Sequence, residues 1–156
     1  MIRRPPRSTL DRSSAASDVY KRQERYSVQE LDMRVLIVSD VHSNIEAFQS
    51  VVHDASNRGG FDKIWSLGDL VGYGPDPLAC LDLLVEHPHI AIAGNHDLGA
   101  VGEITLDDFN QHAADANRWT ASILTAKWLN FIKSQQQKIE IEEFTLGHGC
   151  PRNPIW

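Results

Sequence analysis

The sequence predicts an α/β protein with a largely parallel sheet and helices packed on its faces. Two observations lead to this prediction: short apolar runs alternate with stretches of helical spacing, and polar motifs follow the apolar runs. Strands that alternate with helices in this way are normally joined by crossovers and therefore run parallel. The chain has 156 residues, of which 42% are hydrophobic, so it is long enough for one domain with its own core.

The first part of the chain is predicted to form three strands separated by two helices. Three apolar runs predict buried strands, at residues 35–38, 63–67 and 89–93. Residues 44–58 have apolar side chains at helical spacing, and Gly59 with Gly60 ends that helix. Residues 77–86 predict a second helix, with Pro77 in its first turn after a Gly/Pro-rich loop.

The second part is predicted to form two helices and then two short strands. A helical region at about 107–123 precedes a shorter helix, for which Thr125 is the candidate N-cap. Residues 138–143 and 144–146 have the composition of β-segments, and a Gly-His-Gly motif follows the second of them. The region from residue 33 to residue 156 is therefore expected to be one domain.

Residues 1–32 are expected to be a disordered or extraneous extension. The stretch from Met1 to Gln23 mixes Arg, Ser, Ala and Pro with almost no apolar periodicity, and it resembles translated sequencing-adapter sequence. We therefore expect the natural chain to start at Met33. The alternative is a genuine basic tail.

Charge is distributed unevenly along the chain. Residues 1–32 hold 7 of the 15 Lys and Arg but only 5 of the 21 Asp and Glu, which leaves 8 basic against 16 acidic residues after them. Such an acidic body argues against a nucleic-acid-binding surface, because nonspecific affinity comes mainly from Lys and Arg. No window approaches the roughly 20 apolar residues of a membrane helix. We expect a cytoplasmic protein whose two cysteines, Cys80 and Cys150, are free thiols.

Polar motifs follow the predicted strands in order. They are Asp40-Val41-His42, Gly68-Asp69, Gly94-Asn95-His96-Asp97 and Gly147-His148-Gly149. In an open α/β sheet, ligands bind beyond the carboxyl ends of the strands, where the loops converge. Carboxylate, imidazole and carboxamide groups supply mixed oxygen and nitrogen ligands, which suit Mn²⁺, Fe or Zn²⁺ better than Ca²⁺. Each motif alone is more often an ordinary turn, but together they predict a dinuclear metal site.

These motifs resemble the calcineurin-like metallophosphoesterase superfamily, and in detail its small phosphodiesterase branch, the YfcE-like group. The resemblance covers residues 33–156 and includes the loop from His148 to Arg152. It implies a β-sandwich flanked by helices. It also implies two divalent metal ions, Mn²⁺ before Fe, Zn²⁺ or Ni²⁺, and hydrolysis of phosphate esters by a hydroxide that the ions activate.

The resemblance also implies a role for each motif residue. The ligands would form two sets that share one carboxylate, with Asp40, His42 and Asp69 on the first ion and Asp69, Asn95 and His148 on the second. His96 would be the non-ligand catalytic imidazole that stabilises charge on the phosphoryl group or protonates the leaving oxygen. Asp97 would fix the tautomer and orientation of His96.

The sequence departs from the family pattern in its last motif. The pattern ends with a further Gly-His-x-His, whose two histidines complete both coordination spheres, and the sequence to Trp156 does not contain it. We therefore expect a domain that is incomplete at its C-terminus, binds metal weakly and hydrolyses esters poorly. Cys150 and Asn153 stand where Ser and Asp are more common, and neither is an expected ligand.

A noncatalytic scaffold for protein partners is the alternative function, as in the retromer subunit that keeps this fold. The presence of His96 beside Asp97 favours the enzyme, because a binding protein has no need of a catalytic imidazole. Asn44 and Tyr73 have simpler structural explanations, as a helix cap and as part of a turn. The physiological substrate, the choice between diester and monoester, and the oligomeric state stay open.

Overall fold

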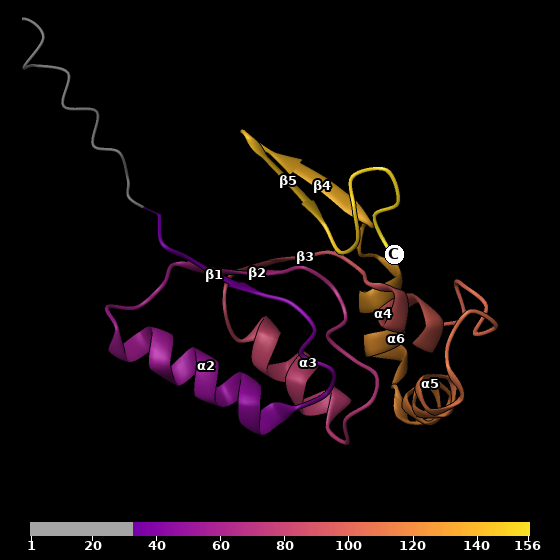
Figure 1. Cartoon of the computed structure of the whole chain (residues 1–156). Helices are drawn as coiled ribbons and strands as arrows, with labels where there is room; N and C mark the ends of the chain where they lie inside the picture. Colours follow the sequence, from indigo (N-terminus) through magenta and orange to yellow (C-terminus); the bar gives the residue numbers. More distant parts are fainter. Residues whose placement is uncertain (1–32) are drawn as a thin grey trace, which may run out of the picture. The chain divides into compact units, whose positions relative to one another are not determined.

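The computed structural model describes residues 33–156, and the expectation for residues 1–32 lies outside this range. The elements follow in the order β1 (Val35–Val38), α2 (Ile45–Asn57), β2 (Lys63–Ser66), α3 (Pro77–Val85), β3 (His89–Ala91), α4 (Asn95–Ala100), α5 (Gln111–Ile123), α6 (Ala126–Lys133), β4 (Lys138–Ile141) and β5 (Phe144–Gly147). This alternation, which can be followed in Figure 1, confirms the predicted α/β class.

Strands β1, β2 and β3 form a parallel sheet with β2 in the middle. The register pairs Leu36 with Ile64, and Ser66 with Ala91. The pairing is parallel because α2 and α3 each return the chain to the start of the next strand. All three strands therefore end at the same edge of the sheet, where the loops with the polar motifs begin.

Successive side chains of the sheet pack into two different layers. Ile64 belongs to the main core with Phe48 of α2 and Leu84 of α3, whereas Trp65 packs with Leu146 of β5. A strand directs successive side chains to opposite faces, so β2 serves both layers. Figure 1 shows α2 and α3 on one side of the sheet and the antiparallel β4–β5 hairpin on the other. The hairpin is the second β layer of the described region.

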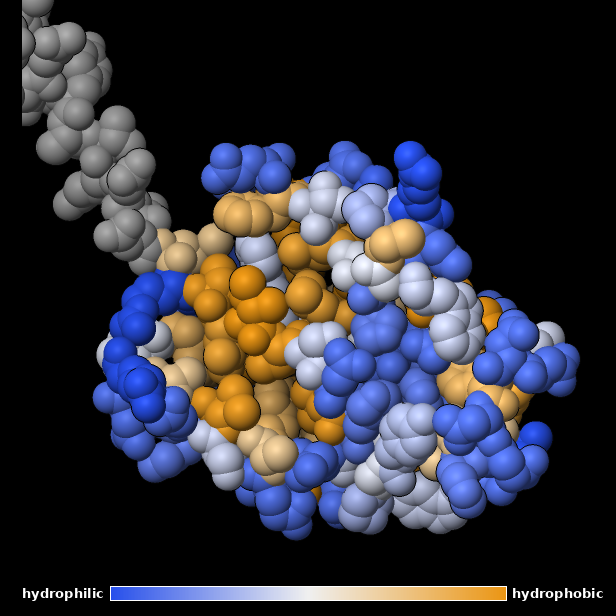
Figure 2. All heavy atoms as spheres, viewed as in Figure 1, coloured by the Kyte–Doolittle hydropathy of each residue, from blue (hydrophilic) through white to orange (hydrophobic). Residues whose placement is uncertain are grey.

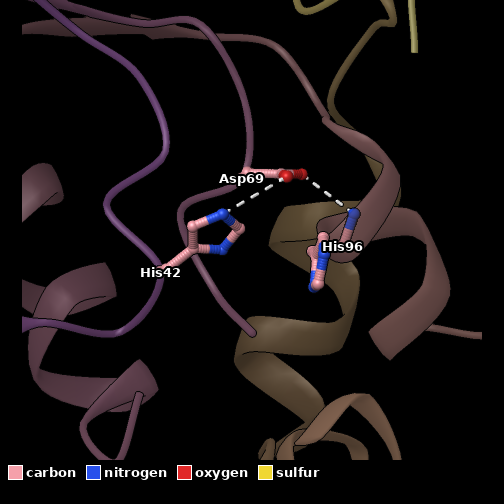
Figure 3. A group of neighbouring side chains, drawn as sticks. All are labelled: His42, Asp69 and His96. Atoms are coloured by element: carbon pink, nitrogen blue, oxygen red, sulfur yellow. Dashed lines mark hydrogen bonds and ion pairs between the residues drawn. The ribbon is translucent and has the colours of Figure 1, made fainter. Parts of the chain in front are cut away.

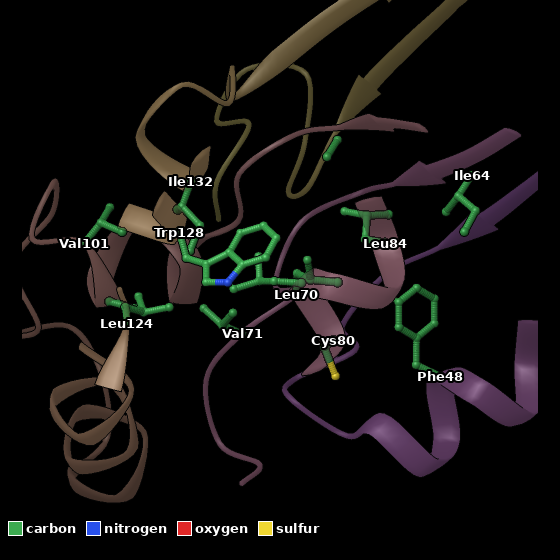
Figure 4. Packing of buried hydrophobic residues seen from close by; sticks show 13 residues of the cluster. Phe48, Ile64, Leu70, Val71, Cys80, Leu84, Val101, Leu124, Trp128 and Ile132 are labelled. Atoms are coloured by element: carbon green, nitrogen blue, oxygen red, sulfur yellow. The ribbon is translucent and has the colours of Figure 1, made fainter. Parts of the chain in front are cut away.

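The main core extends from the sheet into the loop after β2. Trp128 and Ile132 of α6 pack in the same cluster as Leu70 and Val71 of this loop (Figure 4). Leu70 is 5% exposed and Val71 is fully buried, although neither lies in a helix or strand. Apolar burial therefore fixes the loop that begins with Asp69.

Two of the helices that follow β3 differ from the expectation, whereas α6 follows the predicted N-cap Thr125. The motif residue Asn95 begins α4, and the sequence analysis predicted no helix here because a helix this short contains too few turns for a periodic pattern. Helix α5 begins at Gln111 rather than at residue 107. The side chain of Asn110 caps it by accepting a hydrogen bond from the backbone of Ala113 at 3.0 Å.

The two cysteines are free thiols, as expected. Cys80 is buried, and burial raises the pKa of its thiol to about 12, so it packs as an apolar side chain. Cys150 is exposed in the loop after β5. Within residues 33–156, no helix is long and apolar enough to cross a membrane.

Apolar side chains are also exposed beside β1. Ile37 of β1 is 56% exposed and Val51 of α2 is 45% exposed. Two grooves of about 450 and 350 Å³ lie between β1 and α2, and Val51 lines both. Figure 2 shows a continuous apolar area over this part of the surface. The outer edge of β1 is therefore flanked by apolar surface.

Side-chain truncation should lower the free energy of unfolding strongly only on the buried face of α3. Leu84 is fully buried and its neighbour Val85 is 37% exposed. We expect Leu84→Ala to lower the free energy of unfolding by about 2–5 kcal/mol, because the cavity it leaves cannot collapse fully. Val85→Ala is the matched control and should change it by less than about 1 kcal/mol. Urea unfolding followed by circular dichroism measures both, and equal losses would contradict this core.

Candidate metal centre

The loops after β1 and β2 run side by side beyond the sheet. The backbone N–H of Asp40 donates to the carbonyl of Gly68 at 3.1 Å, and that of His42 donates to the carbonyl of Asp69 at 2.9 Å. These hydrogen bonds continue the parallel pairing past the ends of the strands. They bring the side chains of Asp40 and His42 next to that of Asp69.

Several residues of these two loops have a left-handed backbone. The φ angle is +55° at Asp40, +49° at His42, +56° at Ser43 and +54° at Asp69. Residues other than glycine rarely adopt this backbone conformation, which costs on the order of 1–3 kcal/mol per residue. It persists only where the surroundings hold it, and here backbone hydrogen bonds between the two loops do so. Such strain is concentrated at functional sites.

Asp69 lies at the middle of the polar cluster. Its residue is 3% exposed, and its Oδ2 lies 3.7 Å from Nε2 of His42 and 3.3 Å from Nε2 of His148. Its Oδ1 accepts a hydrogen bond from the backbone N–H of His96 at 2.9 Å. Figure 3 shows the carboxylate between the ring of His42, from the loop after β1, and the backbone N–H of His96, at the start of α4. One buried carboxylate thus connects its own motif with the other three.

Two groups of ligand atoms share Asp69. One consists of Asp40, Asp69 and His148, and the other of His42, Asp69 and His96, with the ligand atoms of each group within 4.8 Å of one another. The sequence analysis expected the same shared carboxylate but grouped Asp40 with His42. It also placed His96 outside both ligand sets. A carboxylate shared between two neighbouring groups is what a pair of cations requires.

The imidazoles of His42 and His148 are oriented by backbone carbonyl groups. Nδ1 of His148 lies 2.8 Å from the carbonyl of Leu67, and Nδ1 of His42 lies 3.3 Å from that of Val71. A carbonyl only accepts, so each Nδ1 carries a proton and each Nε2 is directed to the cluster. The carboxylate of Asp69 raises the pKa of His148 to about 9, against the opposing effect of burial. A cation on Asp69 would displace the proton from Nε2.

Asn95 lies at the start of α4, directly after a close contact between Gly94 and Asp69. A Cβ atom at residue 94 would overlap Oδ1 of Asp69 and lie 2.6 Å from its backbone nitrogen. Glycine is therefore required at this position. Asn95 is buried, at 8% exposure. Its amide oxygen is the donor that the sequence analysis expected for the second ion.

Asp97 has a different contact from the expected one. Its Oδ1 accepts a hydrogen bond from the backbone N–H of Val71 and its Oδ2 accepts one from that of Gly94, both at 3.0 Å. Among the hydrogen bonds of residues 33–156, none joins Asp97 to the ring of His96. Adjacent residues of a helix do not face each other, which explains why the expected pair does not form. Asp97 instead holds α4 to the loop after β2.

The imidazole of His96 is buried and hydrogen-bonds with a residue of α5. Its Nδ1 lies 3.2 Å from Nδ2 of Asn117, which is fully buried. The rings of Tyr73 and Phe109 pack on it, with centroids at 4.5 and 5.0 Å. Burial lowers the pKa of His96, and the nearby charge of Asp69 opposes this effect. The sequence analysis missed Asn117 and Phe109, because neither belongs to a motif.

A cleft of about 500 Å³ adjoins the cluster. The residues that line it include Asp40, His42, Asn44 and Tyr73. The side chain of Asn44 accepts a hydrogen bond from the backbone of Ala47 at 3.0 Å, which confirms that it caps α2. The ring of Tyr73 packs edge-on against that of His42, with centroids 4.9 Å apart, and Tyr73 is 49% exposed. The cleft therefore opens to solvent beside Asp40 and His42, and Nε2 of His42 lies 3.7 Å from Oδ2 of the shared carboxylate.

A parallel sheet whose strand-end loops converge on a shared carboxylate, with imidazoles around it, is typical of α/β proteins that bind metal ions. The chain belongs to the calcineurin-like phosphoesterase family, whose profile matches residues 33–151. This confirms the family that the motifs indicate.

Known relatives support this membership. A solved metallophosphoesterase from Sphaerobacter thermophilus is 44% identical with a TM-score of 0.67, and the match covers 80% of this chain and 50% of that one. An uncharacterized protein of Methanocaldococcus jannaschii is 37% identical, over 78% of this chain and 52% of its own. The symmetrical bis(5'-nucleosyl)-tetraphosphatase of Vibrio cholerae is 29% identical, over 72% and 43%. The chain thus spans about half the length of these relatives.

The hydrogen bonds of Asp97 predict a structural effect of its substitution. The carboxylate accepts hydrogen bonds from two backbone N–H groups, and Asp97→Asn would turn an amide N–H toward one of them. We expect it to lower the free energy of unfolding by about 1–3 kcal/mol, because one buried donor loses its acceptor. Asp108→Asn, in an exposed turn, is the matched control and should stay within about 0.5 kcal/mol. Unfolding in urea measures both, and an unchanged Asp97→Asn protein would contradict this role.

Proposed function

We propose that this protein is a metal-dependent phosphoesterase that hydrolyses small phosphate esters at the Asp69 cluster. The observation that carries the proposal is the position of Asp69, whose Oδ2 lies 3.3 Å from Nε2 of His148 and 3.7 Å from Nε2 of His42. Membership of the calcineurin-like phosphoesterase family supports the same chemistry.

The donor set fits two divalent cations. The proposed ligands are Asp40, His42 and Asp69 for the first and Asp69, Asn95 and His148 for the second. Mixed carboxylate, amide and imidazole donors suit Mn²⁺, which we propose first, and also Fe, Zn²⁺ or Ni²⁺. When bound, such ions neutralise phosphate oxygens and lower the pKa of a water molecule toward about 7.

His96 is the proposed catalytic imidazole. Burial lowers its pKa, so the ring is neutral near neutral pH and its N–H group is a hydrogen-bond donor. A neutral ring stabilises negative charge on a phosphoryl oxygen, but it is a poor proton donor to a leaving group. Of the two roles that the resemblance implies, stabilisation of charge is the one that burial supports.

The substrate is proposed to enter through the cleft of about 500 Å³ beside Asp40 and His42. Phosphoryl transfer asks mainly for positioning and for neutralisation of the phosphate oxygens, so the cleft and the cluster together contain the required groups. One relative is named a bis(5'-nucleosyl)-tetraphosphatase, which makes phosphate esters of nucleosides the first substrates to test. The location is proposed to be cytoplasmic, and the oligomeric state stays open.

The noncatalytic scaffold is not favoured as the function. A protein that uses only its surface for partners has no need of a buried imidazole beside a converging set of carboxylates and histidines. His96 is buried at 5% exposure, and it hydrogen-bonds through both its backbone and its ring. This amount of support for one side chain is expected of a reacting group.

Removal of the shared carboxylate charge should abolish metal binding. We expect Asp69→Asn to lower the affinity for Mn²⁺ by more than the roughly 10–100-fold that the loss of a supporting contact costs. Asp82→Asn on the exposed side of α3 is the matched control and should leave the affinity unchanged. Isothermal titration calorimetry with MnCl₂ measures both variants. Tight Mn²⁺ binding by Asp69→Asn would refute the shared-ligand assignment.

Removal of the His96 ring should lower turnover and leave the metal content unchanged. We expect His96→Ala to lower kcat by about 10²–10⁴-fold, the usual contribution of such a group, while the bound metal is retained. The measurement combines bis(p-nitrophenyl) phosphate hydrolysis with atomic absorption for Mn²⁺, Ni²⁺ and Zn²⁺. Full activity in His96→Ala would exclude the catalytic role, and loss of metal would make His96 a ligand. A metal-loaded wild-type protein that is inactive across the panel would favour the scaffold.

A further inference from the structure

We propose that Asn117 is a positioning residue that keeps the proton of His96 on Nε2 and so makes this imidazole a hydrogen-bond donor instead of a metal ligand. The inference rests on the proposed function. It comes from a contact between two helices, because Asn117 lies on α5 and His96 lies on α4.

The tautomer of a neutral imidazole is set by the partner of one nitrogen. Nδ2 of Asn117, an amide donor, lies 3.2 Å from Nδ1 of His96, so Nδ1 accepts and the proton resides on Nε2. Among the hydrogen bonds of residues 33–156, Nε2 of His96 has no protein partner. Its N–H is therefore left for an oxygen of the substrate.

The imidazoles of His42 and His148 have the proton on the opposite ring nitrogen, Nδ1. Nδ1 of His42 and Nδ1 of His148 each face a backbone carbonyl, at 3.3 and 2.8 Å, which places a proton on Nδ1. Their Nε2 atoms then have a lone pair for a cation. His96 lies within 4.8 Å of the ligand atoms of His42 and Asp69, so distance alone does not exclude it as a ligand. The partner of Nδ1 is what distinguishes it from the two others.

Packing prevents the ring of His96 from rotating away from Asn117. Tyr73 and Phe109 lie against it, with ring centroids at 4.5 and 5.0 Å. Gly72, with φ of +92°, approaches so closely that a Cβ atom there would lie 2.6 Å from Nδ1. A rotated ring would meet one of these neighbours, because the side chain is 5% exposed and enclosed. The orientation is thus fixed by packing and the tautomer by Asn117.

The polar groups of Asn117 are not explained by packing. The residue is fully buried, and within residues 33–156 its Oδ1 has no hydrogen-bond partner. An apolar side chain of similar size would fill the same space without burying an unpaired oxygen. The contact with the ring of His96 is therefore the feature that accounts for an amide at this position.

The first test measures the tautomer in the protein without added metal. Nitrogen-15 NMR of the histidine rings, with the His96 signals assigned from His96→Ala, should show a protonated Nε2 and an unprotonated Nδ1 in the wild type. Asn117→Asp presents only acceptors and should move the proton to Nδ1. Thr120→Val, one helical turn further along α5 and also fully buried, is the control and should keep the wild-type pattern. A wild-type ring protonated on Nδ1 would overturn the proposal.

The second test measures turnover. We expect Asn117→Asp to lower kcat by at least about 10-fold with KM within about twofold, whereas Thr120→Val keeps both near the wild-type values. Wild-type kcat in a folded Asn117→Asp protein would also overturn the proposal. If this variant does not fold by circular dichroism, the wild-type NMR spectrum still decides. An inactive wild-type protein would refute the proposed function, and the tautomer would be decided by NMR alone.

Discussion

Asp69 is a buried carboxylate, and a buried charge is costly unless partners compensate for it. Two imidazoles, the backbone N–H of His96 and the close approach of Gly94 surround this side chain. The rest of the fold keeps these partners in place. The parallel strands end together, the loops after β1 and β2 are joined by hydrogen bonds, and apolar burial of Leu70 and Val71 holds the second loop in the core.

The pKa values of the titratable groups around Asp69 shift in different directions, and the balance between burial and hydrogen bonding sets each direction. At His148 the hydrogen bond to the carboxylate outweighs desolvation, so the pKa rises to about 9. At His96 desolvation outweighs the same negative charge, so the pKa falls. At Asp97 burial and the charge of Asp69 both raise the pKa, and hydrogen bonds from backbone N–H groups only partly offset them. One carboxylate thus leaves a cationic imidazole on one side and a neutral imidazole on another.

Much of this arrangement could be predicted from the sequence. The apolar runs gave the three parallel strands, and Asn44 and Pro77 marked helix starts that the structure contains. The motif residues Asp40, His42, Asp69 and His148 do meet, because parallel strands place their following loops at one edge. The contacts of Asp97 and Asn117 could not be predicted, since they depend on how α4 packs against the loop after β2 and against α5. The short helix α4 and the left-handed loop residues gave no periodic signal either.

The contact between α4 and α5 would separate the control of metal binding from the control of the protonated nitrogen of His96. The proposed cation ligands Asp40, His42, Asp69 and His148 belong to the loops that follow strands, whereas Asn117, the proposed positioning residue for His96, belongs to α5. If both proposals hold, a substitution in α5 would change the reactivity of His96 and leave the proposed metal ligands in place. Enzymes built in this way can diverge in chemistry by exchanging a single helical side chain.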